Sequence, residues 1–356
     1  MDRLSGSARA FCHRLKVLRP GGRNSFLSTK ELGLRLRVGL LMSALSLVLA
    51  ATPALAEVSL ELEKVGSWRS IPENNEFLST CGGQGHLIQF ALPDGTKVVC
   101  VAVDLETLSV RPALSEGGTQ PTSVIAARHQ AVAAINGGYF NLSNGESASF
   151  VTAITGAVAD PRVNKALVEN PKLKVFLPQI FARSELRFLR RGKKQAAQIA
   201  GHNEKLPAGA RLVAALQAGP RLLPELTARE EAFLREEPGT GKQVDSIGVN
   251  RPAARSAMGL TADGYLLMVA VAGKGQDEFS SGLTLPQMAL LLKNLGAVAA
   301  LNLDGGTSTT LVCDLGPNDL TKEEPTLKML IGRNPETRVR SALLVVRKDQ
   351  KEKTAH

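Results

Sequence analysis

A buried strand that runs directly into a polar glycine turn constrains this chain of 356 residues most strongly. Residues 298–301 (VAAL) are apolar, and they are followed by Asn302, Asp304, two glycines and four hydroxyl residues at 307–310. A hairpin is one explanation, because Asp-Gly is a strong hairpin signal. A carboxylate beside a bendable backbone and a row of hydroxyls is also typical of a binding or catalytic site. The segment alone leaves both interpretations open.

The same pattern occurs once more, earlier in the chain. Residues 131–136 (AVAAIN) resemble residues 297–302 (AVAALN), and the earlier segment continues as residues 137–140 (GGYF). Each strand therefore ends in an asparagine, Asn136 or Asn302, close to a glycine pair. Glycine pairs at strand ends let a backbone approach a ligand closely, so we expect both strand ends to meet in one cleft.

A helix is predicted before each of these two strands. For the second strand, Thr284 and Gln287 form a capping-box pattern with proline in the first turn, and Gly296 ends the helix predicted over 285–295. For the first strand, a Pro-Thr-Ser sequence begins a helix predicted over 122–130. Small alanines in both units would let the helix pack closely on a sheet.

Elsewhere the pattern indicates many strands and few helices. A third helix is predicted at 225–236, and a Pro-Asp-Gly turn at 93–95 joins the first two strands. The predicted strands are 86–91, 97–105, 132–135, 186–189, 211–216, 265–271, 297–301 and 341–346. This pattern predicts an α+β fold with a mixed, largely antiparallel β-sheet core flanked by a few helices, rather than a doubly wound parallel sheet.

The first 56 residues have the pattern of an export signal. Residues 38–56 carry no charge, two arginines precede them, and Ala54-Leu55-Ala56 matches a signal-peptidase site. An uncleaved anchor is the alternative, but the apolar core at 38–50 is short for a full membrane span. We expect cleavage after Ala56, a periplasmic or secreted product, and no stable membrane span in the mature chain. The organisation expected is a leader at 1–56, a lead-in at 57–94, the main domain at 95–347 and a disordered tail at 348–356.

Most of the basic charge belongs to the leader. The whole chain has a formal net charge of +10, but residues 1–56 hold nine Lys/Arg and two Asp/Glu, which leaves about +3 for the mature part. No nucleic-acid partner is therefore expected. Only residues 183–194 are locally basic. A solvated hairpin is our interpretation of this segment, and contact with an acidic polymer or anionic lipid is the alternative.

Three cysteines remain after cleavage of the leader. A Cys81–Cys100 disulfide would fit an oxidising compartment, and Cys313 is expected to be a buried thiol. The sequence contains no CxxC motif or Cys/His cluster that would predict zinc or a redox centre.

Arginines occur at the ends of several predicted strands. Arg221 follows a Gly-Pro break, Arg255 precedes a strand, and Arg338 and Arg340 repeat the arrangement. Each one alone would be interpreted as a surface charge. Together they have the chemistry of a phosphate clamp, because a planar guanidinium makes two parallel hydrogen bonds to a phosphate. The serine-hydrolase elbow, the P-loop and the dinucleotide-binding fingerprint are absent from the sequence.

Five short motifs resemble those of the phosphodiester glycosidase family, the relatives of N-acetylglucosamine-1-phosphodiester alpha-N-acetylglucosaminidase. They occur in the family's order over about residues 95–347, and Thr307 stands where the family often has a third glycine. The motifs are NGGYF (136–140), QAGPRLL (217–223), RSAMGL (255–260), LNLDGGTSTTL (301–311) and RVRSALL (338–344).

The resemblance implies a hydrolase that cleaves a glycosidic bond to phosphate. A phosphate monoester has a second pKa of about 6, so it leaves with little protonation, and one carboxylate suffices where ordinary glycosidases need two. Asp304 is the candidate nucleophile or base, and Arg221 and Arg255 are the candidate catalytic arginines. The candidate substrate-binding residues are Asn136, Gly137, Gly138, Tyr139, Asn302, Gly305, Gly306, Thr307 and Ser308.

Glu146 is the second carboxylate considered, although an exposed turn is its main interpretation. The sequence requires no cofactor. A divalent cation such as Ca²⁺ beside Asp304 is compatible with these oxygen ligands, and no metal ligand set is assigned.

Two questions about function stay open at this stage. A non-catalytic envelope module of the same fold would bind a cell-wall polymer or an exopolysaccharide, but the retained Asp304, Arg221 and Arg255 favour an enzyme. The substrate is either a small phosphate-linked sugar or a phosphate-linked envelope glycopolymer.

The export signal gives the first testable prediction. When the full chain is expressed in a bacterial host, the protein should appear outside the cytoplasm with Glu57 as its first residue. Intact-mass measurement of the fractionated protein checks this. A soluble cytoplasmic product that keeps the whole leader would contradict it.

Overall fold

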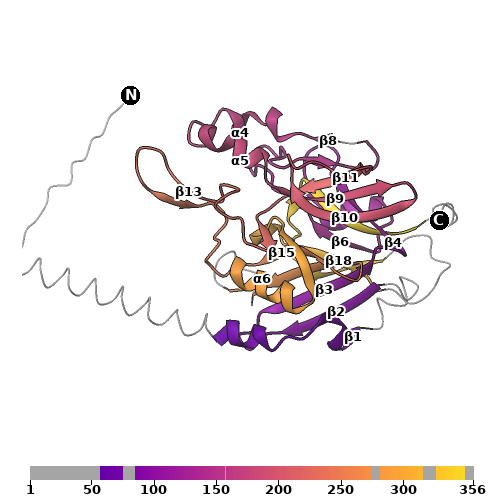
Figure 1. Cartoon of the computed structure of the whole chain (residues 1–356). Helices are drawn as coiled ribbons and strands as arrows, with labels where there is room; N and C mark the ends of the chain where they lie inside the picture. Colours follow the sequence, from indigo (N-terminus) through magenta and orange to yellow (C-terminus); the bar gives the residue numbers. More distant parts are fainter. Residues whose placement is uncertain (1–56, 75–84, 157, 274–280, 316–325, 349–356) are drawn as a thin grey trace, which may run out of the picture. The chain divides into compact units, whose positions relative to one another are not determined.

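The computed structural model describes residues 57–74, 85–156, 158–273, 281–315 and 326–348 (Figure 1). Its largest sheet has seven strands, and every neighbouring pair in it is antiparallel. In spatial order the strands are β1 (Glu73–Asn74), β2 (Gly85–Ala91), β3 (Lys97–Asp104), β16 (Tyr265–Ala272), β15 (Arg255–Thr261), β17 (Ala297–Asn302) and β12 (Arg221–Leu223).

Two five-stranded sheets pack with it, and both are antiparallel throughout. One contains, in order, β19 (Leu327–Ile331), β18 (Leu311–Asp314), β6 (Ala133–Asn136), β21 (Ser341–Arg347) and β4 (Leu108–Leu114). The other contains β10 (Lys194–Gly201), β9 (Ser184–Arg191), β11 (Arg211–Gln217), β7 (Val151–Thr152) and β8 (Val158–Ala159). Two small ribbons pair β13 (Leu234–Glu236) with β14 (Gln243–Asp245), and β5 (Gln120–Pro121) with β20 (Arg338–Val339).

Helices are short and few in the described part of the chain. Besides residues 57–63, the α-helices are α3 (Thr122–Arg128), α4 (Lys165–Val168), α5 (Leu177–Phe181) and α6 (Leu285–Asn294). The 3₁₀ turns are η1 (Trp68–Ser70), η2 (Pro161–Val163), η3 (Lys174–Phe176) and η4 (Gly306–Ser308). The predicted α+β class with a largely antiparallel core is confirmed. None of the helices in these described ranges is long and apolar enough to cross a membrane.

The central strands are buried on both faces, which explains their nearly continuous apolar runs. In β3, Val99, Val101 and Val103 face a core shared by all three large sheets. The alternate residues Val98 and Cys100 face a second core, which α6 covers. This follows from the two-residue period of a strand, which sends successive side chains to opposite faces.

Both predicted helix–strand units are present. Helix α3 leads into β6, and α6 leads into β17, so Asn136 and Asn302 each end a buried strand. Strand β6 lies in a five-stranded sheet and β17 in the seven-stranded sheet. The segment 303–310 therefore crosses from one sheet to the other, and it carries Asp304 across that junction.

The helix predicted over 225–236 is wrong. The segment forms turns and then strand β13. Its polar side chains bond to the backbone of Arg221: the Arg221 N–H donates to Thr227 Oγ1 (3.0 Å) and to Glu231 Oε1 (3.2 Å). Ala232 has a φ of 56°, in the left-handed region that ends a helix.

The capping box at the start of α6 is confirmed, and it gives a stability prediction. Thr284 Oγ1 accepts from the Gln287 N–H (3.3 Å), while Gln287 Oε1 accepts from the Thr284 N–H (3.0 Å). Thr284→Ala should lower the free energy of unfolding by about 1 kcal/mol, whereas Thr284→Ser should keep most of the stability that the cap provides. Urea denaturation of the mature chain measures both. An alanine variant as stable as the wild type would contradict the role of this cap.

Candidate active site

The side chain of Asn136 connects the elements that carry the candidate residues. Its Nδ2 donates to the carbonyl of Asp304 (2.6 Å), and its Oδ1 accepts from Ser256 Oγ (2.6 Å) and from the Thr310 N–H (3.1 Å). The side chain is fully buried. A buried amide that is satisfied on both ends fixes its partners rigidly, so the crossing segment 303–310 has one position relative to both sheets.

Tyr139 and Asn302 form a second connection beside the first. The Tyr139 hydroxyl donates to the carbonyl of Gly219 (2.8 Å). Asn302 Nδ2 lies within hydrogen-bond distance of the Tyr139 hydroxyl (2.9 Å) and of the Leu303 carbonyl (2.7 Å). Burial raises the pKa of Tyr139 above its usual range, with the Asp304 charge adding to the effect, so this phenol stays neutral. The Tyr139 loop, the 217–221 segment and the end of β17 therefore meet at one point.

Asp304 is the one predicted carboxylate at this junction. Its N–H donates to the Gly137 carbonyl (3.1 Å), and its Oδ1 accepts from the Gly305 N–H (3.0 Å). Burial raises the pKa of the carboxyl from 3.8 to about 7, and hydrogen bonds from Ser308 and Gly305 offset only part of that rise. The group is therefore present in both protonation states near neutral pH, as a group that exchanges protons in catalysis must be.

The predicted glycines are positions of close backbone approach. A Cβ on Gly137 would lie 2.4 Å from Ser341 Oγ, and one on Gly138 would lie 2.3 Å from the carbonyl oxygen of Gln217. Gly306 has a φ of 61°, which favours glycine. Gly305 lies against the backbone of residues 254–255, since a Cβ there would be 3.0 Å from the Ala254 carbonyl oxygen. Thr307 and Ser308 complete turn η4, with Ser308 buried and Thr307 partly exposed.

The side chain of Arg255 is occupied by the protein itself. It is buried, and its guanidinium donates to the carbonyls of Leu283 (2.9 Å), Ile247 (2.9 Å), Gly248 (2.5 Å) and Arg251 (2.7 Å). Its observed contacts therefore hold the segments around residues 247–251 and 283. Arg338 and Arg340 likewise donate to backbone carbonyls between residues 115 and 119.

Arg221 differs from Arg255 in this respect. Its side chain is half-buried, and its Nε is enclosed without a hydrogen-bond partner among the described residues. Its backbone pairs with that of Leu301 in the neighbouring strand β17, and Leu301 lies three residues before Asp304 in the sequence.

Two further charged residues lie at this junction, although the sequence analysis placed Arg183 in a solvated basic hairpin and Glu231 in a predicted helix. Glu231 is 6% exposed, and a Cβ on Gly219 would lie 2.1 Å from its Oε2. Arg183 is 8% exposed, with its guanidinium carbon 3.7 Å from the ring centroid of Phe233 and 5.9 Å from that of Tyr139. No local motif marks either residue. Their importance arises from burial, which depends on contacts between distant segments.

The remaining sequence candidates lie apart from this junction or outside the described residues. Glu146 is exposed, and its carboxylate accepts from the side chain of Asn144 (2.9 Å) within a turn. Within the part of the chain that the structure describes, no three His, Cys, Asp or Glu side chains are grouped as a metal site. Cys100 is buried and forms no disulfide with a described residue, and burial raises the pKa of its thiol to about 12. Cys81 lies outside the described residues.

Comparison with known proteins identifies the family. The family model for phosphodiester glycosidases (NAGPA) matches residues 129–346, more than half of the chain. This chain belongs to the phosphodiester glycosidase family. All five motifs lie within or overlap that match. No curated protein sequence matches this chain significantly.

The similar solved structures belong to distant proteins. The catalytic domain of zebrafish N-acetylglucosamine-1-phosphodiester alpha-N-acetylglucosaminidase is 17% identical, with a TM-score of 0.50 over 80% of this chain and 87% of that one. A hypothetical protein from Synechocystis is 19% identical, with a TM-score of 0.43 over 74% of this chain and 62% of its own length. A Burkholderia pseudomallei protein is 16% identical, with a TM-score of 0.44 over 74% of each chain. The zebrafish structure supports the fold.

The raised pKa of Asp304 leads to a prediction about stability. The unfolded chain releases this proton near pH 4, whereas the folded chain holds it to about pH 7. Folding therefore opposes ionisation, and this carboxyl makes the fold progressively less stable as pH rises from 4 to 7. Asp304→Asn should melt at a higher temperature than the wild type at pH 8, and the difference should disappear near pH 4.

Asp263 provides a control of opposite sign. Hydrogen bonds from Thr261 and Arg69 lower the pKa of this exposed carboxyl, so Asp263→Asn should gain no stability at pH 8. Differential scanning calorimetry across the pH range measures all three proteins. A melting difference for Asp304→Asn that does not change with pH would contradict the raised pKa.

Proposed function

We propose that the mature chain is an exported hydrolase that cleaves the bond between a sugar and phosphate in a sugar phosphodiester. Membership of the phosphodiester glycosidase family supports the reaction class. The position of Asp304 carries the proposal within this chain. It is a carboxyl group with a pKa of about 7, at the junction of four of the five family motifs, with Tyr139 and Asn302 beside it.

The proposed chemistry needs one carboxylate. A sugar alkoxide is a poor leaving group, so ordinary glycosidases use two carboxyl groups, one of which protonates the leaving oxygen as a general acid. A phosphate monoester leaves without that help, because its second pKa is about 6. We assign to ionised Asp304 the attack on the anomeric carbon, or the activation of a water that attacks it. As the attack proceeds, the bond between that carbon and the phosphate oxygen breaks, and its electron pair leaves with the phosphate. If Asp304 itself attacks, water then hydrolyses the glycosyl ester, which releases the sugar and restores the carboxylate.

The surrounding residues receive different proposed roles. We assign Arg221, whose enclosed Nε has no partner among the described residues, to the phosphate charge. We assign to Arg255 the positioning of the 247–251 and 283 segments, since its donors are already engaged. Residues 136–139, Asn302 and the turn 305–308 are proposed to form the wall against which the sugar lies. No cofactor is assigned, and a divalent cation at Asp304 would be detected as metal-dependent turnover.

The proposed location is the periplasm or the medium, and the proposed substrate is a phosphate-linked sugar or envelope glycopolymer. A non-catalytic envelope module would bind such a polymer without cleaving it. Release of reducing sugar from a sugar 1-phosphodiester by the purified mature chain separates the two functions. Polymer binding with no release would favour the binding module.

Replacement of Asp304 should abolish turnover while the fold remains. We expect Asp304→Asn to lower kcat by more than about 10³-fold on a sugar phosphodiester, whereas Glu146→Gln should lower it less than about twofold. Freshly purified protein is needed, because an asparagine followed by glycine slowly returns to aspartate by deamidation. Full activity in Asp304→Asn would exclude this carboxylate, and a large loss in Glu146→Gln would identify the other one.

The same carboxyl predicts the pH dependence of the reaction. Because the ionised form reacts and the pKa is about 7, kcat/KM should fall about tenfold per pH unit well below pH 7. Initial rates with a soluble sugar phosphodiester at subsaturating concentration measure this. A profile that stays flat down to pH 5 would mean that the reacting group has an ordinary carboxyl pKa.

A further inference from the structure

Arg183 has an unusual environment for an arginine. It precedes strand β9 and is 8% exposed. The ring of Phe233 stacks on its guanidinium at 3.7 Å, and its Nε donates to the carbonyl of Glu231 (3.0 Å). The ring contact and the Nε hydrogen bond together fix the orientation of the guanidinium plane.

The terminal nitrogens of Arg183 have no protein acceptor within the described ranges. The Nε bond is the only hydrogen bond that its side chain makes to a described residue. In the described ranges, Nε of Arg221 is fully buried and has no hydrogen-bond partner. The terminal nitrogens of Arg183 are not among the atoms that are both fully buried and without a partner. These two nitrogens are therefore not fully enclosed, and their hydrogens are available to a bound group.

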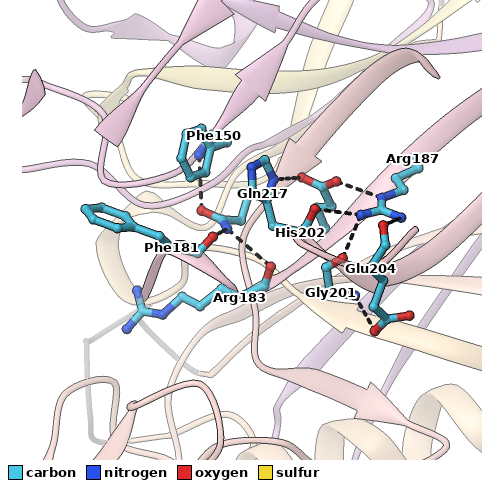
Figure 2. A network of polar contacts seen from close by, with 9 residues as sticks. Phe150, Phe181, Arg183, Arg187, Gly201, His202, Glu204 and Gln217 are labelled. Carbon is cyan, nitrogen blue, oxygen red and sulfur yellow. Dashed lines mark hydrogen bonds and ion pairs between the residues drawn. The ribbon is translucent and has the colours of Figure 1, made fainter. Parts of the chain in front are cut away.

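Arg187 of β9, a second buried arginine four residues further along the chain, has a purely structural set of contacts. Arg187 of β9 donates to Glu185 Oε1 (2.7 Å) and to the carbonyls of Glu204 (3.0 Å), Gly201 (2.6 Å) and His202 (2.8 Å). Figure 2 shows Arg187 inside this network, while the guanidinium of Arg183 extends away from it. Arg187 pairs with Glu185 and with three backbone carbonyls. Arg183 has neither a carboxylate partner nor an acceptor for its terminal nitrogens among the described residues.

Burial of Arg183 disfavours the charged form of its guanidinium. Burial lowers the pKa of its guanidinium to about 10, and the neighbouring Glu231 carboxylate offsets only part of this effect, so Arg183 remains a cation at neutral pH. Oε1 of the Glu231 carboxylate accepts from Ser184 Oγ (2.7 Å) and from Thr227 Oγ1, while its buried Oε2 has no hydrogen-bond partner among the described residues. This carboxylate forms no ion pair with Arg183 in the part of the chain that the structure describes. Arg235 adds a further positive charge nearby. A buried cation without a paired anion is unfavourable unless a ligand supplies the anion.

The family motif QAGPRLL fixes the backbone of Arg183. Gln217 Nε2 donates to the carbonyls of Phe181 (3.0 Å) and Arg183 (3.2 Å), and its Oε1 accepts from the Phe150 N–H (3.1 Å), as Figure 2 shows. The next residue, Ala218, donates its N–H to the Ser184 carbonyl (3.0 Å). The segment that leads to Arg221 therefore also positions Arg183.

Arg183 lies beside the candidate active site. Its guanidinium carbon is 5.9 Å from the ring centroid of Tyr139. The Tyr139 hydroxyl lies 3.4 Å from the carbonyl of Leu303, the residue before Asp304. An anion held by the terminal nitrogens of Arg183 would thus lie on the Tyr139 side of the junction.

We propose that Arg183 is a phosphate-binding residue of this site, whose two terminal nitrogens grip the phosphoryl group of the substrate. Phosphate fits better than a sugar hydroxyl, because a planar guanidinium pairs bidentately with two phosphate oxygens. The identity of the whole substrate rests on the proposed function, whereas phosphate binding by Arg183 does not. The residue would select phosphate-linked sugars over neutral glycosides.

Calorimetric titration with inorganic phosphate tests the proposal without any turnover. The wild-type mature chain should bind phosphate saturably, with chloride at equal ionic strength as the blank. Arg183→Gln should weaken binding at least about tenfold, since a hydrogen bond to a charged group is lost. Arg235→Gln, which removes a neighbouring charge, should change affinity much less. No saturable binding in the wild type, or equal binding in a folded Arg183→Gln, would overturn the proposal.

A measurement on the wild-type chain covers the case in which Arg183→Gln does not fold. Phenylglyoxal modifies accessible arginines, and mass spectrometry locates the modified residue. Phosphate should protect Arg183 but not Arg162, whose side chain is 64% exposed and pairs with Asp160 on the surface. Equal modification of Arg183 with and without phosphate would overturn the proposal.

The two hypotheses fail separately. If phosphate binds through Arg183 but no sugar phosphodiester is hydrolysed, the proposed reaction is wrong and the phosphate site stands. If sugar phosphodiesters are hydrolysed with the same kcat/KM by wild type and Arg183→Gln, the reaction stands and the role of Arg183 is wrong.

Discussion

The buried amide of Asn136 is the interaction on which the rest of the site depends. It joins the end of β6 to Ser256 in the neighbouring sheet and to both sides of the crossing segment, at Asp304 and at Thr310. The bonds to Ser256 and Thr310 are buried and the bond to the Asp304 carbonyl is partly buried. An unpaired polar group in the interior costs about 1–3 kcal/mol. The crossing segment cannot move away without leaving several such groups unpaired.

This fixed crossing explains the chemistry of Asp304. Its carboxyl is held between two sheets, where the loss of hydration outweighs the hydrogen bonds from Ser308 and Gly305, so its pKa rises to about 7. The glycines at 137, 138 and 305 let the surrounding segments approach one another closely. The same packing encloses the guanidinium of Arg255 among backbone carbonyls, while Arg183 keeps its terminal nitrogens available.

Local sequence patterns were sufficient for the elements that carry the site. The helix–strand units, the asparagine and glycine strand ends, and the capping box at Thr284 are all short-range features, and they are present as predicted. The helix predicted at 225–236 failed because Thr227 and Glu231 bond to the backbone of Arg221, a contact outside the periodicity of the segment. The contacts of Arg255 and the burial of Arg183 also depend on distant residues, such as Leu283 and Phe233. No local pattern could have distinguished which arginine is saturated by the protein.

Direct titration of the Asp304 carboxyl by carbon-13 NMR tests the central claim, that the sheet junction holds this group at a functional pKa. The resonance is identified as the carboxyl signal that is lost in Asp304→Asn. The structure predicts a midpoint near pH 7 in the mature, ligand-free chain. A midpoint near 4, the ordinary value for an aspartate, would contradict the account, because the junction would then not desolvate the carboxyl.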